Sequence, residues 1–211
     1  MRKVILIILI IVSGQAVKAQ HAGYSPVTEP ARFKEQFTAV AKKTETIKSD
    51  FLQEKNLSML SEKISSKGKF WFKKENQLRM EYFKPYEYLM ILNKDNMYIN
   101  DGKKETKISV KSNKILQQIN KIIVDCVQGA VFNNPDFTAS PYENKGEYLV
   151  ELTPVAKGLK EFFKSIDVII DKKDYSVVTI VMNENSGDNT TLHFTNRELN
   201  TAIPDALFTI K

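Results

Sequence analysis

Residues 68–85 read GKFWFKKENQLRMEYFKP, and this stretch decides the fold class of the chain. In its first half, Phe70 and Phe72 fall on one side of an extended backbone and Trp71 on the other, because successive side chains of a β-strand point to opposite faces. The second half alternates large apolar residues with charged ones in the same way: Leu78, Met80 and Tyr82 against Arg79 and Glu81. The polar segment between the halves predicts a turn, so we expect a β-hairpin of strands 67–74 and 77–84.

Strand patterns continue on both sides of this hairpin. We expect further strands at 47–55, 88–92, 96–100, 105–111, 136–141, 147–153, 165–171, 174–183 and 189–196. Neighbours such as 88–92 and 96–100 are joined by only a few residues, which is too short for the crossover that parallel strands need. The sequence therefore predicts a mainly β fold with one antiparallel sheet.

Two helical patterns accompany the strands. Residues 31–47 carry apolar side chains at helical spacing, beginning with Phe33 and Phe37. A second amphipathic helix follows Ser112 and stops at Gly129, since glycine commonly terminates helices. Its apolar face consists of Ile115, Leu116, Ile119, Ile122, Ile123, Cys126 and Val127. We expect these elements to form a single domain, residues 20–211.

The N-terminal segment has the features of a secretory signal peptide. Arg2 and Lys3 precede the apolar run Val4–Val12, which is about half as long as a membrane-spanning helix. Small residues then provide a cleavage site, with cleavage expected after Ala19. We therefore expect residues 1–19 to be removed and the mature protein to be periplasmic.

Composition and charge exclude several classes of protein. The chain has 211 residues, 42% hydrophobic and 27% charged, with one cysteine, which excludes a disordered or disulfide-stapled chain. Removing residues 1–19 takes away three basic residues and no acidic one, so the formal net charge falls from +6 to +3. Such a mildly basic, exported protein is not expected to bind nucleic acid.

The sequence lacks the common motifs of enzymes and metal sites. His21 and His193 are too few for a three-histidine metal set, and the single Cys126 excludes a Cys-x-x-Cys site. No P-loop, Gly-rich dinucleotide motif or G-x-S-x-G elbow occurs. Cys126 lies on the apolar face of its helix, which predicts a buried, unreactive thiol. We expect no enzymatic activity, no cofactor and no bound metal.

The apolar strand face has two interpretations. The helices close an ordinary filled core, or a strongly curved sheet encloses an apolar ligand cavity with the second helix as its lid. Both arrangements require the same residues to face inward, so periodicity alone leaves both open.

Residues 68–85 resemble the signature of the periplasmic outer-membrane lipoprotein carrier family, the LolA proteins: a glycine, an aromatic strand, a basic turn, a second strand and a proline. Three further segments match in the same order: Phe51-x-Gln53-x-Lys55, the Asn93 turn before Met97–Ile99, and Ile203-Pro204 followed by Phe208. The resemblance implies an incomplete, strongly curved antiparallel β-barrel closed by amphipathic helices.

The resemblance also implies a function without covalent chemistry. The concave apolar face of such a protein holds the acyl chains of triacylated lipoproteins. An inner-membrane ABC-type complex releases these lipoproteins, and an outer-membrane acceptor or the membrane surface receives them. We expect the carrier to be a monomer.

Some residue roles follow from the same resemblance. It assigns the acyl-chain cavity to Phe70, Phe72, Leu78, Met80, Tyr82 and Ile91, and the lid to Ile115, Ile119, Ile122 and Ile123. Family members commonly have an arginine after the aromatic strand that ties the lid to the rim of the barrel, and Lys74 stands there in this chain. Because lysine lacks the planar fork of arginine, we expect Lys74 to form a weaker latch.

Two other functions stay open at this stage. The same fold suits a module that senses lipids or lipoproteins and regulates a partner, and an exported enzyme or structural domain is a third alternative. An apolar cavity favours the carrier or the sensor, whereas a filled barrel with a polar cleft elsewhere favours the third alternative.

Overall fold

The computed structural model describes residues 21–60, 62–112 and 114–210, and for residues 114–120 it describes the backbone alone. These residues form one sheet, the helices α1 (Pro30–Lys43), α2 (Lys114–Gln128) and α3 (Lys157–Lys160), and 3-10 segments at Val110–Ser112, Val131–Asn133 and Asp205–Phe208. The predicted signal peptide, 1–19, lies outside the described residues and stays a prediction.

The sheet places the strand Thr46–Leu57, from the first third of the chain, beside the strand Asn189–Leu199, from its last part, at its centre. Across the sheet the described strands follow the order β1 (Ser25–Pro26), β8 (Phe137–Glu143), β9 (Glu147–Pro154), β10 (Phe163–Asp171), β11 (Val177–Glu184), β12 (Asn189–Leu199), β2 (Thr46–Leu57), β3 (Glu62–Lys73), β4 (Gln77–Lys84), β5 (Tyr88–Asn93), β6 (Asn96–Asn100) and β7 (Glu105–Ser109). All of these neighbours pair antiparallel, as the short links predicted. The described strands β1 and β7 do not pair with each other, so the sheet is open rather than a closed barrel.

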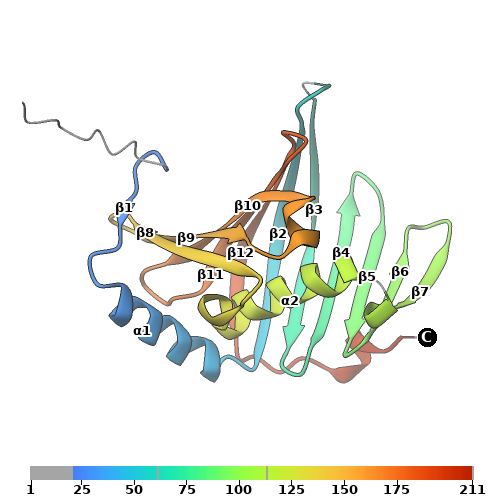
Figure 1. Ribbon diagram of the computed structural model, residues 1–211. Helices are drawn as coiled ribbons and strands as arrows, with labels where there is room; N and C mark the ends of the chain where they lie inside the picture. Colours follow the sequence, from blue (N-terminus) through green and yellow to red (C-terminus); the bar gives the residue numbers. More distant parts are fainter. Residues whose placement is uncertain (1–20, 61, 113, 211) are drawn as a thin grey trace, which may run out of the picture.

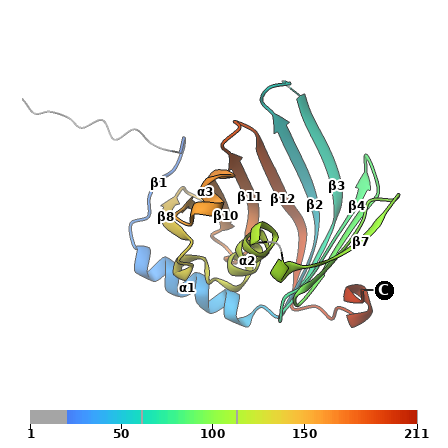
Figure 2. The same cartoon turned by 45° about the vertical axis from the view of Figure 1, so that its right-hand side comes forward.

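The open sheet is strongly curved. Figure 1 shows α2 in front of the sheet and α1 along one end of the strands. In Figure 2 the strands curl around α2, with β8 and β10 on one side and β4 and β7 on the other. The predicted fold class, a mainly β, incomplete and strongly curved antiparallel barrel with amphipathic helices, is confirmed.

Most predicted boundaries agree with the structure to within a few residues. The strands at 77–84 and 96–100 are as predicted, and the second helix ends before Gly129 as expected. Gly129 takes a left-handed φ of 68°, and a Cβ there would lie 2.8 Å from the Cβ of Ala41 in α1. A glycine at this position therefore both ends α2 and lets its end approach α1 closely.

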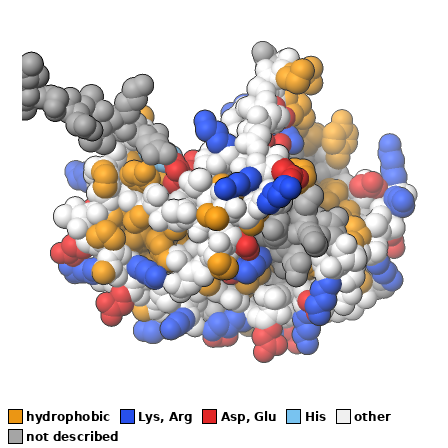
Figure 3. All heavy atoms as spheres, in the orientation of Figure 1, with side chains coloured by type: hydrophobic (Ala, Val, Ile, Leu, Met, Phe, Trp, Pro, Cys, Tyr) orange, Lys and Arg blue, Asp and Glu red, His pale blue; other side chains and the backbone are white. Residues whose placement is uncertain are grey.

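The largest difference from the sequence prediction is the length of the β2–β3 hairpin. These strands extend to Leu57 and from Glu62, well beyond the predicted 47–55 and 67–74, and the hairpin projects beyond the rest of the sheet (Figure 1). Near its tip Met59 is 91% and Leu60 64% exposed, and apolar atoms are visible there in Figure 3. Polar residues dominate this segment on both faces, so its alternation was too weak to predict a strand.

The two faces of the sheet carry separate apolar clusters. The inner face, which the helices cover, holds the main cluster, in which Phe70 pairs with Met80 and Phe72 with Leu78. Trp71 lies on the opposite face with its partner Arg79, as the alternation predicted.

The C-terminal segment packs on the outer face. The second cluster consists of Ile91, Tyr98, Ile203 and Phe208, with Trp71, Leu89, Leu207 and Ile210 packed against it. The side chain of Arg79 donates a hydrogen bond to the carbonyl of Leu207 (3.1 Å), and Asn93 donates to the carbonyl of Phe208 (3.1 Å). The Ile-Pro and Phe of the C-terminal motif therefore cover the outside of β3–β6. Over the described residues, no helix combines the length and apolar character needed to cross a bilayer.

Candidate functional site: an apolar pocket under the helices

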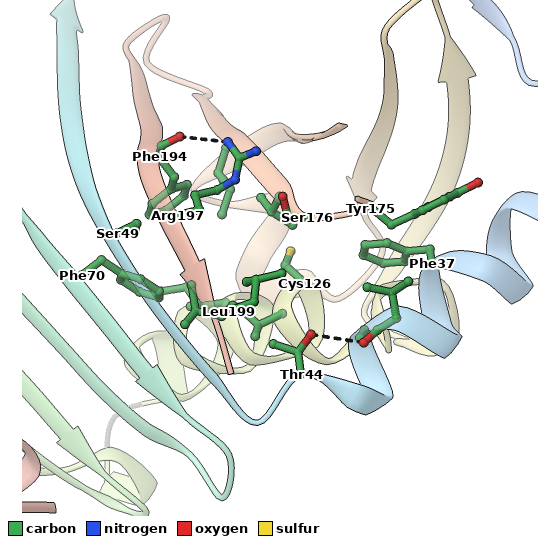
Figure 4. A pocket seen from close by; sticks show the side chains of 17 residues that line it. Phe37, Thr44, Ser49, Phe70, Cys126, Tyr175, Ser176, Phe194, Arg197 and Leu199 are labelled. Carbon is green, nitrogen blue, oxygen red and sulfur yellow. Dashed lines mark hydrogen bonds between the residues drawn. The ribbon is translucent and has the colours of Figure 1, made fainter. Parts of the chain in front are cut away.

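An apolar pocket lies between α1, α2 and the inner face of β2, β3, β11 and β12 (Figure 4). Its walls are mainly aliphatic and aromatic, including Phe37, Val40 and Ala41 of α1, Ile123, Cys126 and Val127 of α2, and Ile47, Phe70, Val177, Ile180, Phe194 and Leu199 of the sheet. Its volume is about 50 Å³. Pockets that hold drug-sized ligands measure about 300–1,000 Å³, so this conformation has no room for an acyl chain.

α2 forms one wall of this pocket and therefore limits its volume. Of the predicted lid residues, Ile123 lines the pocket and Ile122 is buried in the main cluster. The side chains of Ile115 and Ile119 lie outside the described residues. Displacing α2 would join the pocket to the apolar surface that the helix now covers.

The predicted cavity residues are distributed over the inner face. Phe70 lines the pocket, whereas Phe72, Leu78 and Met80 are buried in the same cluster beyond its walls. Tyr82 is partly buried and donates a hydrogen bond to Oε1 of Gln53 (2.9 Å). Burial raises the pKa of Tyr82 to about 12, so its hydroxyl stays protonated at neutral pH.

Ile91 does not lie with these residues. It pairs with Arg79 across β4–β5 and belongs to the outer cluster, so the prediction placed it on the wrong face. The predicted strand 88–92, YLMIL, is apolar at every position and gives no alternation from which a face can be read. Leu92 pairs with the inward-facing Leu78, so Leu92 rather than Ile91 faces inward.

Lys74 contacts the end of α1. Its Nζ donates to Oε1 of Glu45 (2.5 Å) and to the carbonyl of Lys42 (2.7 Å). Its backbone N–H also donates to the carbonyl of Glu45 (2.8 Å). These contacts fasten the β3–β4 turn to the end of α1. The resemblance had instead predicted that Lys74 contacts the lid helix, α2.

A β-bulge in β12 turns Arg197 into the pocket, and the sequence did not predict this. β12 pairs with β2 at Thr195–Asp50 and again at Glu198–Lys48, so two residues of β12 face one residue of β2. The bulge residue Asn196 takes a left-handed φ of 51°. A bulge shifts the alternation by one residue, so Arg197 faces the pocket instead of the outside.

Polar groups at the pocket are only partly satisfied. Nη1 of Arg197 donates to the carbonyl of Phe194 (3.3 Å), and Nη2 lies 3.6 Å from carboxylate oxygens of Asp171 and Asp174. Nε of Arg197 and Oγ of Ser49 are buried without a hydrogen-bond partner. Because unsatisfied buried polar groups are unfavourable, a ligand oxygen that accepts from them would be stabilised there.

Two carboxylates lie beside the single guanidinium of Arg197. Burial by itself raises the pKa of Asp174, but hydrogen bonds from Ser176 and the charge of Arg197 outweigh it and leave this pKa below its usual value. Asp171 and Asp174 thus hold Arg197 at the wall of the pocket, while its Nε has no hydrogen-bond partner.

The ionisable groups among the described lining residues do not form a nucleophile–base pair. They are Arg197, Tyr175 and Cys126, and Tyr175 donates to Gln36 in α1. Cys126 is buried, and its burial raises the pKa of the thiol to about 12, as expected for an unreactive cysteine. The described walls of the pocket are therefore mainly apolar, with Arg197 as their charged group.

The chain thus combines an open, curved antiparallel sheet with helices on its inner face and an apolar pocket between them, which is the architecture of LolA-like proteins. The family model described as outer membrane lipoprotein carrier protein LolA matches residues 42–211. The chain belongs to this family. No curated protein matches the chain significantly.

Solved structures share the fold at low sequence identity. MucB has a TM-score of 0.51 and 12% identity, over 89% of this chain and 65% of MucB. An uncharacterised conserved protein from Thermus thermophilus has a TM-score of 0.50 and 10% identity, over 84% of this chain and 93% of that one. A LolA superfamily protein from Nitrosomonas europaea has a TM-score of 0.48 and 10% identity, over 85% and 96%. At such identities the likeness concerns the fold alone.

Proposed function

We propose that this protein is a periplasmic carrier that binds the acyl chains of lipoproteins on its inner face and moves them from the inner to the outer membrane. Membership of the lipoprotein carrier family supports this proposal. The observation that carries it is the apolar lining of the pocket, which α1, α2 and the inner face of the sheet share and which displacement of α2 would enlarge.

Binding requires α2 to move. Each buried CH₂ group contributes about 0.8 kcal/mol, so a long acyl chain supplies enough free energy to displace an amphipathic helix from part of the inner face. The apolar side chains of α2, such as Ile123, then compete with the ligand for the same surface. This competition lowers the net affinity and assists release.

Arg197 gives the pocket a polar end. The ester or carboxyl oxygens of an acylated ligand are hydrogen-bond acceptors, and Nε of Arg197 is a buried donor without a partner. We propose that the acyl chains occupy the apolar walls and that such an oxygen accepts a hydrogen bond from Arg197.

The proposed partners follow from the carrier role. They are triacylated lipoproteins as cargo, an inner-membrane ABC-type complex that releases them, and an outer-membrane acceptor or the membrane surface that receives them. The signal peptide predicted at residues 1–19 supports a periplasmic location.

Displacement of a fluorescent fatty acid tests the site. Ile123→Glu puts a charge into the wall of the pocket and is expected to lower probe affinity at least tenfold. Ala39→Glu, at an exposed position of α1, is the matched control and should bind as the original chain does. Circular dichroism confirms that both variants fold, and unchanged binding by a folded Ile123→Glu variant would refute the site.

Transfer of lipoprotein between membranes tests the carrier role separately. We expect purified protein to accept triacylated lipoprotein from inner-membrane vesicles that contain the releasing complex, and to deliver it to outer-membrane vesicles. Binding without delivery would instead support the sensor module.

A further inference from the structure

One imidazole and two carboxylates lie close together on the outer face of the sheet, away from the pocket. His21 comes from the N-terminal segment, Glu151 from β9 and Asp167 from β10. One ligand atom from each residue lies within 4.8 Å of the other two, and Nε2 of His21 is 2.7 Å from Oε2 of Glu151. Glu151 and Asp167 are directly paired across β9–β10, which holds the two carboxylates side by side.

The cluster lies on the face opposite the main core. Val150, Leu152 and Val168, which neighbour the two acids in sequence, belong to the inner cluster, so the acids between them point outward. The N-terminal segment covers them there, and the ring of His21 packs edge-on against Tyr142 with 5.0 Å between ring centroids. As a result Glu151 is only 7% and Asp167 only 9% exposed.

Asp167 carries a buried oxygen that the protein leaves unsatisfied. Its Oδ2 accepts a hydrogen bond from Nδ2 of Asn183 (3.2 Å), but its Oδ1 is buried without a partner. A buried oxygen without a hydrogen-bond partner is unfavourable, and coordination to a bound cation would satisfy it.

We propose that His21, Glu151 and Asp167 bind one divalent transition-metal ion of the zinc class. An imidazole nitrogen and two carboxylate oxygens are ligands that Zn²⁺ accepts at about 2.0–2.2 Å, and three protein ligands leave a fourth position for water. Two ligand atoms of a tetrahedral zinc site lie about 3.4 Å apart. The cluster reaches this spacing when the 2.7 Å contact of His21 with Glu151 widens and the most distant pair closes.

The groups around the cluster hold the ligands in position. Asn183 also donates to Oγ of Ser165, which fixes the amide that contacts Asp167 (3.0 Å and 3.2 Å). Thr153 donates to Oε1 of Glu151 (3.3 Å), the oxygen that does not face His21. Such outer contacts orient metal ligands in known sites.

The ligand set also predicts which ions bind. Mg²⁺ and Ca²⁺ prefer six or more oxygen ligands, whereas the imidazole of His21 favours Zn²⁺ and its neighbours in the transition series. When bound, the ion fastens the N-terminal segment to β9 and β10. This role is independent of the carrier function, because the site lies on the opposite face of the sheet from the pocket.

Calorimetric titration of the metal-free protein with ZnCl₂ tests the proposal. We expect one Zn²⁺ per chain and no saturable binding of Mg²⁺ or Ca²⁺. His21→Ala and Asp167→Asn should each lower zinc affinity at least tenfold. His193→Ala is the matched control, because His193 is the other histidine of the chain and contacts Thr179 instead, and it should bind zinc normally.

Two results would overturn the site. If His193→Ala weakens binding as much as His21→Ala, zinc binds histidines nonspecifically. If His21→Ala abolishes binding and Asp167→Asn does not, His21 binds the ion without the sheet. Asp167→Asn is nearly isosteric, and a thermal unfolding scan without metal establishes that it is folded before it is titrated.

Discussion

The ring of Phe51 in β2 packs directly against the α-carbon of Gly68, its cross-strand partner in β3. A Cβ at Gly68 would lie 2.5 Å from Cζ of Phe51 and 2.3 Å from the carbonyl oxygen of Glu81 in β4. The ring can yield, but the backbone of β4 cannot move without distorting the β3–β4 ladder. Gly68, the first residue of the stretch 68–85, therefore has no space for a side chain.

Gly68→Ala is expected to destabilise the fold by about 2–3 kcal/mol, because overpacking of this kind forces a shift of the backbone. Urea unfolding measures the change in the free energy of unfolding. Gly146→Ala is the matched control, since a Cβ at Gly146 would meet nothing within 4 Å. Equal stability of the two variants would show that the close approach of Gly68 to the backbone of Glu81 does not limit the size of residue 68.

Replacing Arg197 should change ligand preference more than stability. We expect Arg197→Met to weaken binding of a long-chain fatty acid about tenfold, because hydrogen bonds to charged groups contribute about 1.5–3 kcal/mol. Binding of a neutral apolar probe should not change. Lys48→Met, which removes an exposed cation paired with Glu198, should leave both affinities unchanged. Equal losses for the acid and the neutral probe would contradict the assigned role.

Cys126 should make the fold sensitive to alkaline pH. Its pKa is about 12 in the folded protein and about 8.5 in an unfolded chain. The unfolded state therefore loses the thiol proton first, and the stabilisation that is complete below pH 8.5 disappears as the pH rises toward 12.

The expected slope is a loss of up to about 1.4 kcal/mol in the free energy of unfolding per pH unit above pH 8.5 from this residue. Urea unfolding of the original chain and of Cys126→Ala at several pH values isolates it, because the buried tyrosines contribute equally to both. Parallel pH profiles would show that Cys126 is not shielded from water.

Lys74→Leu should alter ligand transfer with little effect on stability. The ion pair of Lys74 with Glu45 is at the surface, and such pairs contribute about 0–1 kcal/mol. The contact nevertheless fixes the end of α1, which supplies Ala41 and Thr44 to the pocket. We expect a changed rate of fatty-acid transfer to vesicles. Lys73→Leu, which breaks a contact to Asp205 instead, should keep the original rate. Identical rates for both variants would remove Lys74 from the mechanism.

The hairpin of β3 and β4 could be predicted from the sequence because its apolar residues alternate and are separated by a polar turn. Phe70 and Leu78 therefore appeared on the correct face. The same logic failed for Ile91, because residues 88–92 are all apolar and only the pairing with β4 determines which face Ile91 takes.

The polar residues of the two candidate sites could not be predicted from the sequence, because their positions depend on how the strands pair in three dimensions. Arg197 faces the pocket because a bulge at Asn196 breaks the alternation. The residues around Asn196 show no sequence pattern that predicts this bulge. His21, Glu151 and Asp167 are brought together by strand pairing and by the docking of the N-terminal segment. Neither contact leaves a spacing motif in the sequence.

The pairing of β2 with β12 has a consequence for how the chain acquires its fold. Asn56 and Asn189, whose side chains are hydrogen-bonded, are 133 residues apart, so β2 is synthesised long before its partner. Contacts of such long range slow folding, because the intervening loop must be closed before they form. Until β12 arrives, one edge of β2 offers unpaired backbone groups to any other extended chain. A chain in which β12 has not yet formed is therefore vulnerable to aggregation along residues 46–57.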